Sequence, residues 1–133
     1  MKLFIVPALL SCSLLLACSK DPGEGGKAEI RGRVVEQRYN SIGQPSGDPY
    51  PVAEQNVYII YGDASDGQFP DDNVDTAPDG TFRFKWLRKG SYTIYTMSEC
   101  NTCASGEQGV FRSTEIGDKK EVVQVGDLLI ANY

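Results

Sequence analysis

The sequence contains no histidine, and this absence excludes several classes of site. Without imidazole the chain has no Ser-His-Asp or Cys-His nucleophile activation and no imidazole metal ligands. Its 133 residues, of which 41% are hydrophobic, fit one small domain with a single core. Acidic residues outnumber basic ones by 18 to 13, and the net charge of −5 argues against a nucleic-acid partner. The composition therefore favours a small domain that binds neither DNA nor RNA.

The N-terminal segment has the pattern of a secretory signal. Lys2 precedes an apolar run over residues 3–17, which is shorter than the roughly 20 residues that a spanning helix needs. We expect residues 1–17 to be a cleaved signal peptide. The run ends in Leu15-Leu16-Ala17-Cys18, which resembles the lipobox of bacterial lipoproteins. This resemblance implies that Cys18 carries diacylglycerol and fatty acid such as palmitate, which attaches the protein to a membrane; an ordinary signal cleaved nearby is the alternative.

Residues 18–27 contain no aromatic or branched apolar residue, so we expect a flexible tether with a reach of roughly 30 Å. Lys20 and Asp21 resemble the short charged export signal of Bacteroidota surface lipoproteins. This resemblance implies an outer-membrane lipoprotein displayed on the cell surface, with a periplasm-facing anchor or a plain linker as alternatives. Loss of Lys2 with the signal leaves 12 basic and 18 acidic residues, so anionic lipid headgroups would repel the domain as a whole.

From Ala28 onward, apolar residues recur at a spacing of two, which predicts an all-β domain over residues 28–133. The segment 57–61 is apolar on both faces, so we expect it to be a central strand. Residues 37–52 are expected to form a long loop. Seven strands with short turns are typical of a two-sheet Greek-key β-sandwich, and we expect them over residues 30–35, 57–61, 73–76, 81–87, 92–97, 110–116 and 121–131.

Asp79-Gly80 is the best-defined local signal in the chain. This dipeptide tolerates the positive φ angles of a type I′ turn, which predicts a hairpin between the strands on either side. In the strand that follows, Phe82, Phe84 and Trp86 share one face by alternation. We therefore expect three aromatic anchors in the core.

Four short motifs resemble those of the carboxypeptidase regulatory-like, transthyretin-like domain family, to which collagen-adhesin B-type (CnaB-like) repeats are structurally related. They occur in the family's order over most of residues 28–131: Gly32-Arg33-Val34, Val57-Tyr58-Ile59, Asp79-Gly80-Thr81-Phe82 and Leu87-Arg88-Lys89-Gly90-Ser91-Tyr92. The resemblance implies a transthyretin-like sandwich in which Asp79-Gly80 forms a turn and Tyr92 anchors strands over the core. It also implies a structural or binding role, without chemistry at these motifs. The long loop over residues 37–52 departs from the family, which has a tighter turn there.

Cys100 and Cys103 form the one motif that could be reactive. In an exported protein, two cysteines at this spacing are expected to form a small-loop disulfide, with free thiols as the next alternative. Glu99 and a Gly/Ser loop flank the pair and disfavour a thiolate, which argues against redox catalysis. Zinc is disfavoured because the mature chain supplies no further soft or imidazole ligand.

An acidic loop contains a partial calcium-binding pattern. Asp71, Asn73 and Asp75 match the first three ligand positions of an EF-hand loop. The rest of the pattern fails, since Thr76 stands where glycine is required and Phe82 where a bidentate glutamate should be. Solvated turn acids are the default interpretation, and these three residues are a weak calcium candidate.

Tyr39 and Tyr50 lie in the long loop, outside the alternating strands, and their rings suit stacking against sugars. We therefore hold two functions open. The first is a non-enzymatic, lipid-anchored envelope protein that acts as an interaction or structural module with a protein or glycan partner. The second is glycan or nutrient-ligand capture accessory to outer-membrane uptake. An enzyme is disfavoured because no pair of nucleophile and base is evident, and the sequence implies no cofactor.

Overall fold

The structure is a computed structural model that describes residues 21–64 and 68–133. The predicted signal segment 1–17 and the predicted lipidation site, Cys18, lie outside the described residues. Within the described ranges, no helix has the length and apolar character needed to span a membrane.

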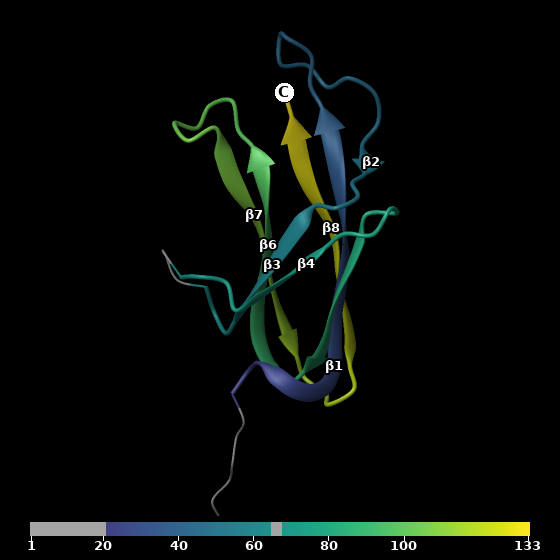
Figure 1. The fold of residues 1–133 in the computed structure, drawn as a ribbon, viewed down its shortest axis with the longest axis vertical. Helices are drawn as coiled ribbons and strands as arrows, with labels where there is room; N and C mark the ends of the chain where they lie inside the picture. Colours follow the sequence, from purple (N-terminus) through teal and green to yellow (C-terminus); the bar gives the residue numbers. More distant parts are fainter. Residues whose placement is uncertain (1–20, 65–67) are drawn as a thin grey trace, which may run out of the picture.

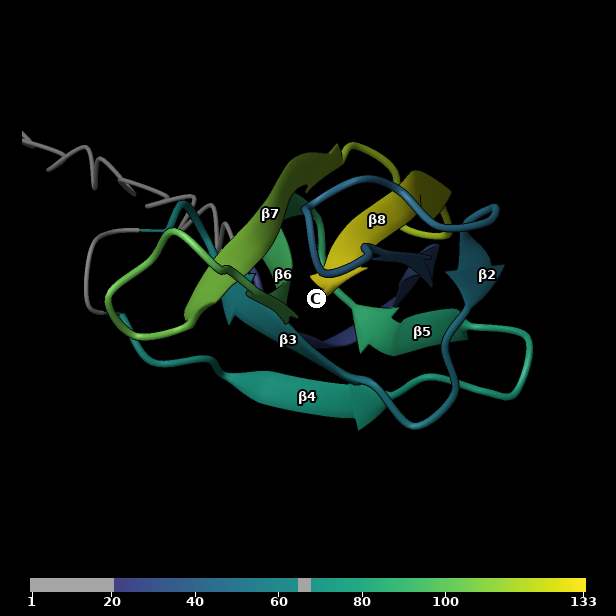
Figure 2. The ribbon, with the colours of Figure 1, turned by 90° about the horizontal axis from the view of Figure 1, so that it is seen from above.

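The chain folds as the predicted all-β sandwich of two sheets, whose layers are separated in the view from above (Figures 1 and 2). In the first sheet, β1 (Glu24–Arg38) pairs with β5 (Thr81–Leu87) and with the short β2 (Tyr50–Pro51). β8 (Val122–Asn132) pairs with β1 in parallel. The second sheet has the order β4 (Asp72–Asp75), β3 (Asn56–Tyr61), β6 (Gly90–Glu99) and β7 (Glu107–Ile116). The seven predicted strands are all present, and β2 is an additional strand within the predicted long loop.

β1 begins at Glu24, six residues before the expected start of the first strand at Ile30 and four before the expected start of the domain at Ala28, so the predicted tether is wrong for residues 24–27. Leu87 pairs with both Glu24 and Ala28, and the residues between them form a bulge. A Cβ on Gly26 would lie 2.0 Å from the backbone oxygen of Leu87, so only glycine allows this approach. Gly26, which in the sequence is typical of a linker, is thus required here by a close contact within the sheet.

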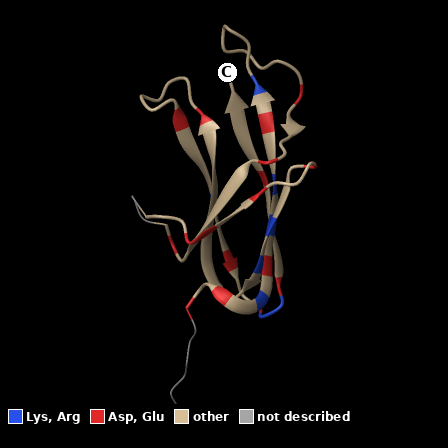
Figure 3. Cartoon of the chain, viewed as in Figure 1, with Lys and Arg blue, Asp and Glu red and all other residues tan. Residues whose placement is uncertain are grey.

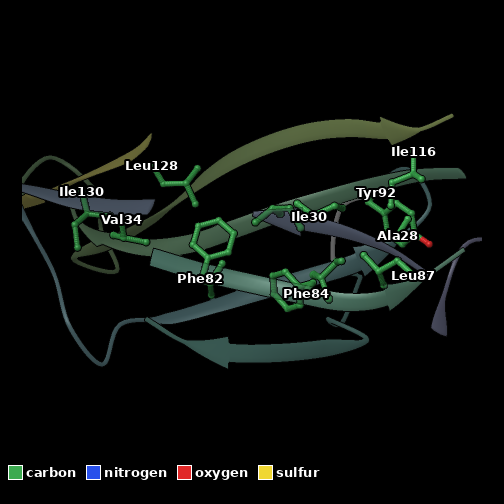
Figure 4. Close-up of a cluster of buried hydrophobic side chains, with 13 residues drawn as sticks. Ala28, Ile30, Val34, Phe82, Phe84, Leu87, Tyr92, Ile116, Leu128 and Ile130 are labelled. Atoms are coloured by element: carbon green, nitrogen blue, oxygen red, sulfur yellow. The ribbon is translucent and has the colours of Figure 1, made fainter. Parts of the chain in front are cut away.

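The core lies between the two sheets, and Figure 4 shows its side chains reaching in from both. Phe82, Phe84 and Tyr92 are buried there, as expected. Trp86 is not, because 66% of it is exposed. Its φ of 60° interrupts the alternation of the strand, and the next residue, Leu87, fills the core position with 2% exposure. The prediction of Trp86 as a core anchor is therefore wrong.

Asp79-Gly80 lies in a turn, but the predicted hairpin is wrong. β4 precedes the turn and β5 follows it, and these strands belong to different sheets, so the chain crosses the sandwich here. Gly80 has a positive φ of 78°, whereas Asp79 does not, and a type I′ turn needs both. The backbone and hydroxyl of Thr81 donate hydrogen bonds to Asp79 Oδ1 at 3.1 and 2.6 Å, and these bonds lower the pKa of Asp79.

Candidate functional site

A cleft of about 280 Å³ lies where β4, at the edge of one sheet, faces β5, at the edge of the other. This volume is just below the roughly 300–1,000 Å³ of sites for drug-sized ligands, so the cleft suits only a small group. Its walls come from β1, β3, β4 and β5, and the lining residues are Glu24, Tyr61, Asp72, Val74, Arg83, Phe84, Lys85, Trp86 and Leu87.

Trp86 is the only tryptophan of the chain, and it is the most exposed aromatic residue of the cleft wall. Its backbone lies in the left-handed region, which costs a residue with a Cβ about 1–2 kcal/mol. Such strain gathers at ligand sites, where the surrounding structure holds it. Here the burial of Leu87 and the contact of Gly26 with the Leu87 backbone hold the strand end in place. The fold thus keeps a large aromatic side chain at the surface, beside a cleft.

Tyr61 contributes a second aromatic wall from the end of β3. Its ring packs edge to face on the buried ring of Tyr92, with 5.9 Å between centroids. Burial, and then the nearby carboxylates of Glu24 and Asp72, raise the pKa of Tyr61 to about 12. A tyrosine phenol is protonated at neutral pH, so Tyr61 can both donate and accept hydrogen bonds in the cleft.

Charges of both signs surround the cleft. Arg83 donates to both carboxylate oxygens of Glu29 at 2.9 and 3.1 Å, and this bond is the main cause of the lowered pKa of Glu29. Lys85 joins Arg83 on the β5 side, while Glu24 and Asp72 supply carboxylates from β1 and β4. A lining of aromatic rings with donors and acceptors suits a polar ligand with hydroxyl groups better than a ligand of one strong charge.

Tyr39 and Tyr50, the two tyrosines predicted as sugar-stacking candidates, lie away from the cleft and have partners of their own. The ring of Tyr39 stacks on that of Tyr133, with centroids 4.8 Å apart. Tyr50 donates its hydroxyl to Glu36, and the guanidinium of Arg38 lies 5.0 Å from its ring centroid. These contacts occupy one face of each ring and fasten the long loop and the C-terminal residue to the sheet.

A third aromatic group crosses the outer face of the second sheet. Tyr58, Tyr95 and Phe111 are cross-strand neighbours on β3, β6 and β7, and their centroids are 4.9 and 5.0 Å apart. The rings are nearly parallel, at 21° and 26°, so their faces lie against one another. Such a ladder stabilises strand pairing, and Phe111 at its end is 53% exposed.

Cys100 and Cys103 are joined by a disulfide in the loop between β6 and β7, with their Cα atoms 5.4 Å apart. The backbone of Cys100 donates to Gly106 at 2.8 Å, which closes the loop around the bridge. In this structure the two sulfurs are bonded to each other and constrain the loop, so neither is a free nucleophile.

The calcium candidate is not assembled. Asp71 Oδ2 accepts the backbone N–H of Tyr61 at 2.7 Å, and Asn73 and Asp75 lie on the extended strand β4. Within residues 21–64 and 68–133, no three Cys, Asp or Glu side chains come together as a metal site. The extended strand β4 keeps these residues apart, whereas an EF-hand loop wraps its ligands around one ion.

The sequence does not indicate the main lining residues of the cleft. Its patterns place Glu24 in the tether, Trp86 in the core and Tyr61 in the central strand 57–61. One signal for Trp86 was present: Trp86 and Leu87 are consecutive large apolar residues at a strand end, and only one of them can face the core.

Comparison with known proteins finds no family model that matches this chain. No curated protein matches it either. Among solved structures, the chain is similar to a crystal structure from Pseudomonas aeruginosa described as a "putative carbohydrate binding protein". The two share 13% sequence identity with a TM-score of 0.47, and the match covers 83% of this chain and 91% of the other.

Proposed function

We propose that this protein is a non-enzymatic, lipid-anchored binding module of the bacterial envelope, of the carboxypeptidase regulatory-like type. The lipobox before Cys18 and the charged pair Lys20-Asp21 support an anchor at the outer membrane with display on the surface. The observation that carries the binding role is Trp86, which a strained backbone holds at the surface beside a cleft.

The anchor is tested by growth of producing cells with labelled palmitate. The full chain incorporates label and fractionates with membranes, whereas Cys18→Ala loses the label. A matched control, Cys100→Ser with Cys103→Ser, keeps the label because those cysteines lie in a disulfide far along the chain. Label retained in Cys18→Ala contradicts the anchor.

A second candidate function, capture of a glycan, is favoured by the composition of the cleft. Sugar rings present apolar C–H faces that pack on aromatic rings, and Trp86 and Tyr61 offer such rings. The hydroxyl groups of a sugar can form hydrogen bonds with Glu24, Asp72 and Lys85 at the rim of the cleft. The cleft accommodates about one sugar ring. This predicts recognition of the terminal sugar of a glycan or of a single sugar within it.

A glycan array followed by calorimetry tests this candidate. Trp86→Ala is expected to weaken binding of any glycan found by about tenfold or more, as loss of a central aromatic contact does. Phe111→Ala is the matched control, because Phe111 is 53% exposed and lies on the ladder outside the cleft. Equal affinities of the two variants contradict glycan capture at this site, and an array without hits favours a protein partner.

A further inference from the structure

The edge strands of the two sheets differ in how their outer backbone groups are protected. β8 is capped by β6 of the other sheet: Ser98 Oγ accepts the backbone N–H of Ala131 at 2.8 Å, and Glu99 accepts that of Tyr133 at 2.8 Å. β4 and β7 lie at the two ends of the second sheet (Figure 2), and β4 has only four residues. β7, in contrast, pairs with β6 without interruption over all ten of its residues, and it contains neither proline nor lysine, which commonly blunt an edge. β7 is therefore an edge that a further strand can join.

The backbone of β7 turns its odd-numbered residues to the outside. In an antiparallel pair, only alternate residues exchange hydrogen bonds with the partner strand. The N–H of Cys100 donates to the oxygen of Gly106 at 2.8 Å at the start of this ladder, so the even-numbered residues of β7 bond to β6. The backbone groups of the odd-numbered residues over 107–115 therefore point away from β6. The Phe111 oxygen accepts the exposed guanidinium of Arg112 at 3.2 Å, and an N–H of an incoming strand can replace this bond.

The ladder of aromatic rings on the second sheet stops at this edge. Its centroids are 4.9 and 5.0 Å apart, which is close to the spacing of about 4.7–4.9 Å between neighbouring strands. Phe111 is 53% exposed, since β7 is the last strand of the sheet. Its ring leans along β7 over Gly109, where a Cβ would lie 2.4 Å from the ring. A further strand would place a side chain against the outer face of this ring.

The sequence of β7 is complementary to itself in one antiparallel register. In this register Val110 faces Val110 of a second copy on a two-fold axis. The outward residues then pair so that Gly109 faces Phe111 of the second copy, and Glu107 faces Ser113 of the second copy. Glycine leaves room for the opposing ring, and serine offers a hydroxyl group to the carboxylate. Because each Phe111 ring leans over the Gly109 of its own chain, the two rings lie side by side across the axis.

Neighbouring registers are less favourable. An axis at Phe111 sets Glu107 of each copy opposite Glu115 of the other, and like charges directly opposite one another destabilise a sheet. Figure 3 shows acidic bands at the start of β7 and near its end. An axis at Arg112 opposes two guanidinium groups, and an axis at Gly109 sets glycine against glycine and separates the two rings. Charge and ring packing thus favour the axis at Val110.

We propose that β7 is a homodimer interface, in which the edges of two copies pair antiparallel about a two-fold axis at Val110. The second sheets of the two copies then become one continuous sheet, and the same surface serves both copies, as two-fold symmetry requires. Backbone hydrogen bonds hold the strands together, and the opposed side chains set the register. Three rings from each copy form one ladder across the axis. The interface needs neither the lipid anchor at Cys18 nor the cleft beside Trp86.

Oxidative cross-linking of the purified full chain tests the register. All variants carry Cys18→Ala, so that neither a lipid nor a further thiol contributes, and Cys100 and Cys103 are bridged to each other. Residues that face each other without hydrogen bonds have Cα atoms about 4.5 Å apart, within reach of a disulfide. Val110→Cys is therefore expected to form a disulfide-linked dimer at least about tenfold faster than Ser113→Cys. Ser113 is the matched control, because it is exposed on the same strand but lies roughly 20 Å from its counterpart in the dimer.

Sedimentation velocity at rising concentration tests the same interface without a new cysteine. Phe111→Ala is expected to lower the dimerisation constant at least about threefold, because the contact between the two rings is lost. Leu129→Ala is the matched control, since Leu129 is 50% exposed but lies on β8, and it is expected to leave the constant unchanged.

Two results overturn the homodimer. One is cross-linking of folded Val110→Cys that is no faster than that of Ser113→Cys. The other is a chain with the native β7 that sediments as a monomer at every concentration, which leaves this edge to a strand of another protein. If Val110→Cys does not fold, sedimentation of Phe111→Ala and Leu129→Ala decides, and equal dimerisation constants for these two variants count against the interface.

Discussion

Removal of a single hydroxyl group from Tyr92 is expected to release the start of β1 from the domain. Tyr92 is 1% exposed, and its hydroxyl connects two backbone segments that are distant in sequence. It donates to the Arg88 carbonyl at 2.7 Å and accepts the N–H of Gly23 at 2.8 Å. The variant Tyr92→Phe keeps the ring in the core and removes both hydrogen bonds.

The magnitude follows from the groups that lose their partners. A buried donor or acceptor left unsatisfied costs about 1–3 kcal/mol. Gly23 can escape much of this cost, because the segment that contains it can detach and regain water. We therefore expect Tyr92→Phe to lower the free energy of unfolding by about 2 kcal/mol. The main structural effect is expected to be detachment of residues 21–26 from the domain.

Urea denaturation followed by circular dichroism measures the global change, and amide hydrogen exchange at Gly23 measures the local one. Tyr95→Phe is the matched control, because its ring stacks on Tyr58 and the structure shows no hydrogen bond from its hydroxyl to any described residue. The control is expected to change stability by less than about 0.5 kcal/mol. Equal stability of the two variants, with hydrogen exchange at Gly23 unchanged, would refute the claim that the Tyr92 hydroxyl holds the start of β1 against the domain.

Three further changes test other features. Trp86→Gly relieves the left-handed backbone, so the free energy of unfolding is expected to stay constant or rise by up to about 1 kcal/mol in urea; a clear loss contradicts the strain. The pKa of Glu29 is lowered, chiefly by its hydrogen bond from Arg83. The ionised carboxylate therefore stabilises the fold at pH values above its ordinary pKa of 4.5, and this stabilisation is lost as the pH falls below that value. Arg83→Ala is therefore expected to lessen the difference between urea midpoints at about pH 6 and about pH 3. Joint replacement of Cys100 and Cys103 by serine is expected to cost about 2 kcal/mol, from the entropy of closing a short loop, and reducing agent should destabilise only the parent protein.

Alternation of side chains predicted the strands because it is a property of each strand alone. The segment 57–61 is apolar on both faces, and the structure places β3 between β4 and β6, as its pattern indicated. Phe82, Phe84 and Tyr92 are buried for the same local reason. These features need no knowledge of which strands become neighbours.

The errors come from contacts between distant segments. The conformation of Trp86 depends on the bulge of β1 against Leu87, and nothing local to either segment specifies that pairing. Asp79-Gly80 has the chemistry of a tight turn, but the destination of the next strand is decided by the pairing of β5 with β1. The cleft was missed because four strands each supply part of it, and no motif spans them.

The parallel pairing of β1 with β8 sets when the domain can finish folding. Glu29 pairs with Val122 and Arg38 with Asn132, so one edge of the first strand stays open until the last strand of the sandwich has been synthesised. Contacts of such long sequence separation form slowly. Completion of the first sheet therefore waits for residues 122–132, which supply the last strand to pair with β1.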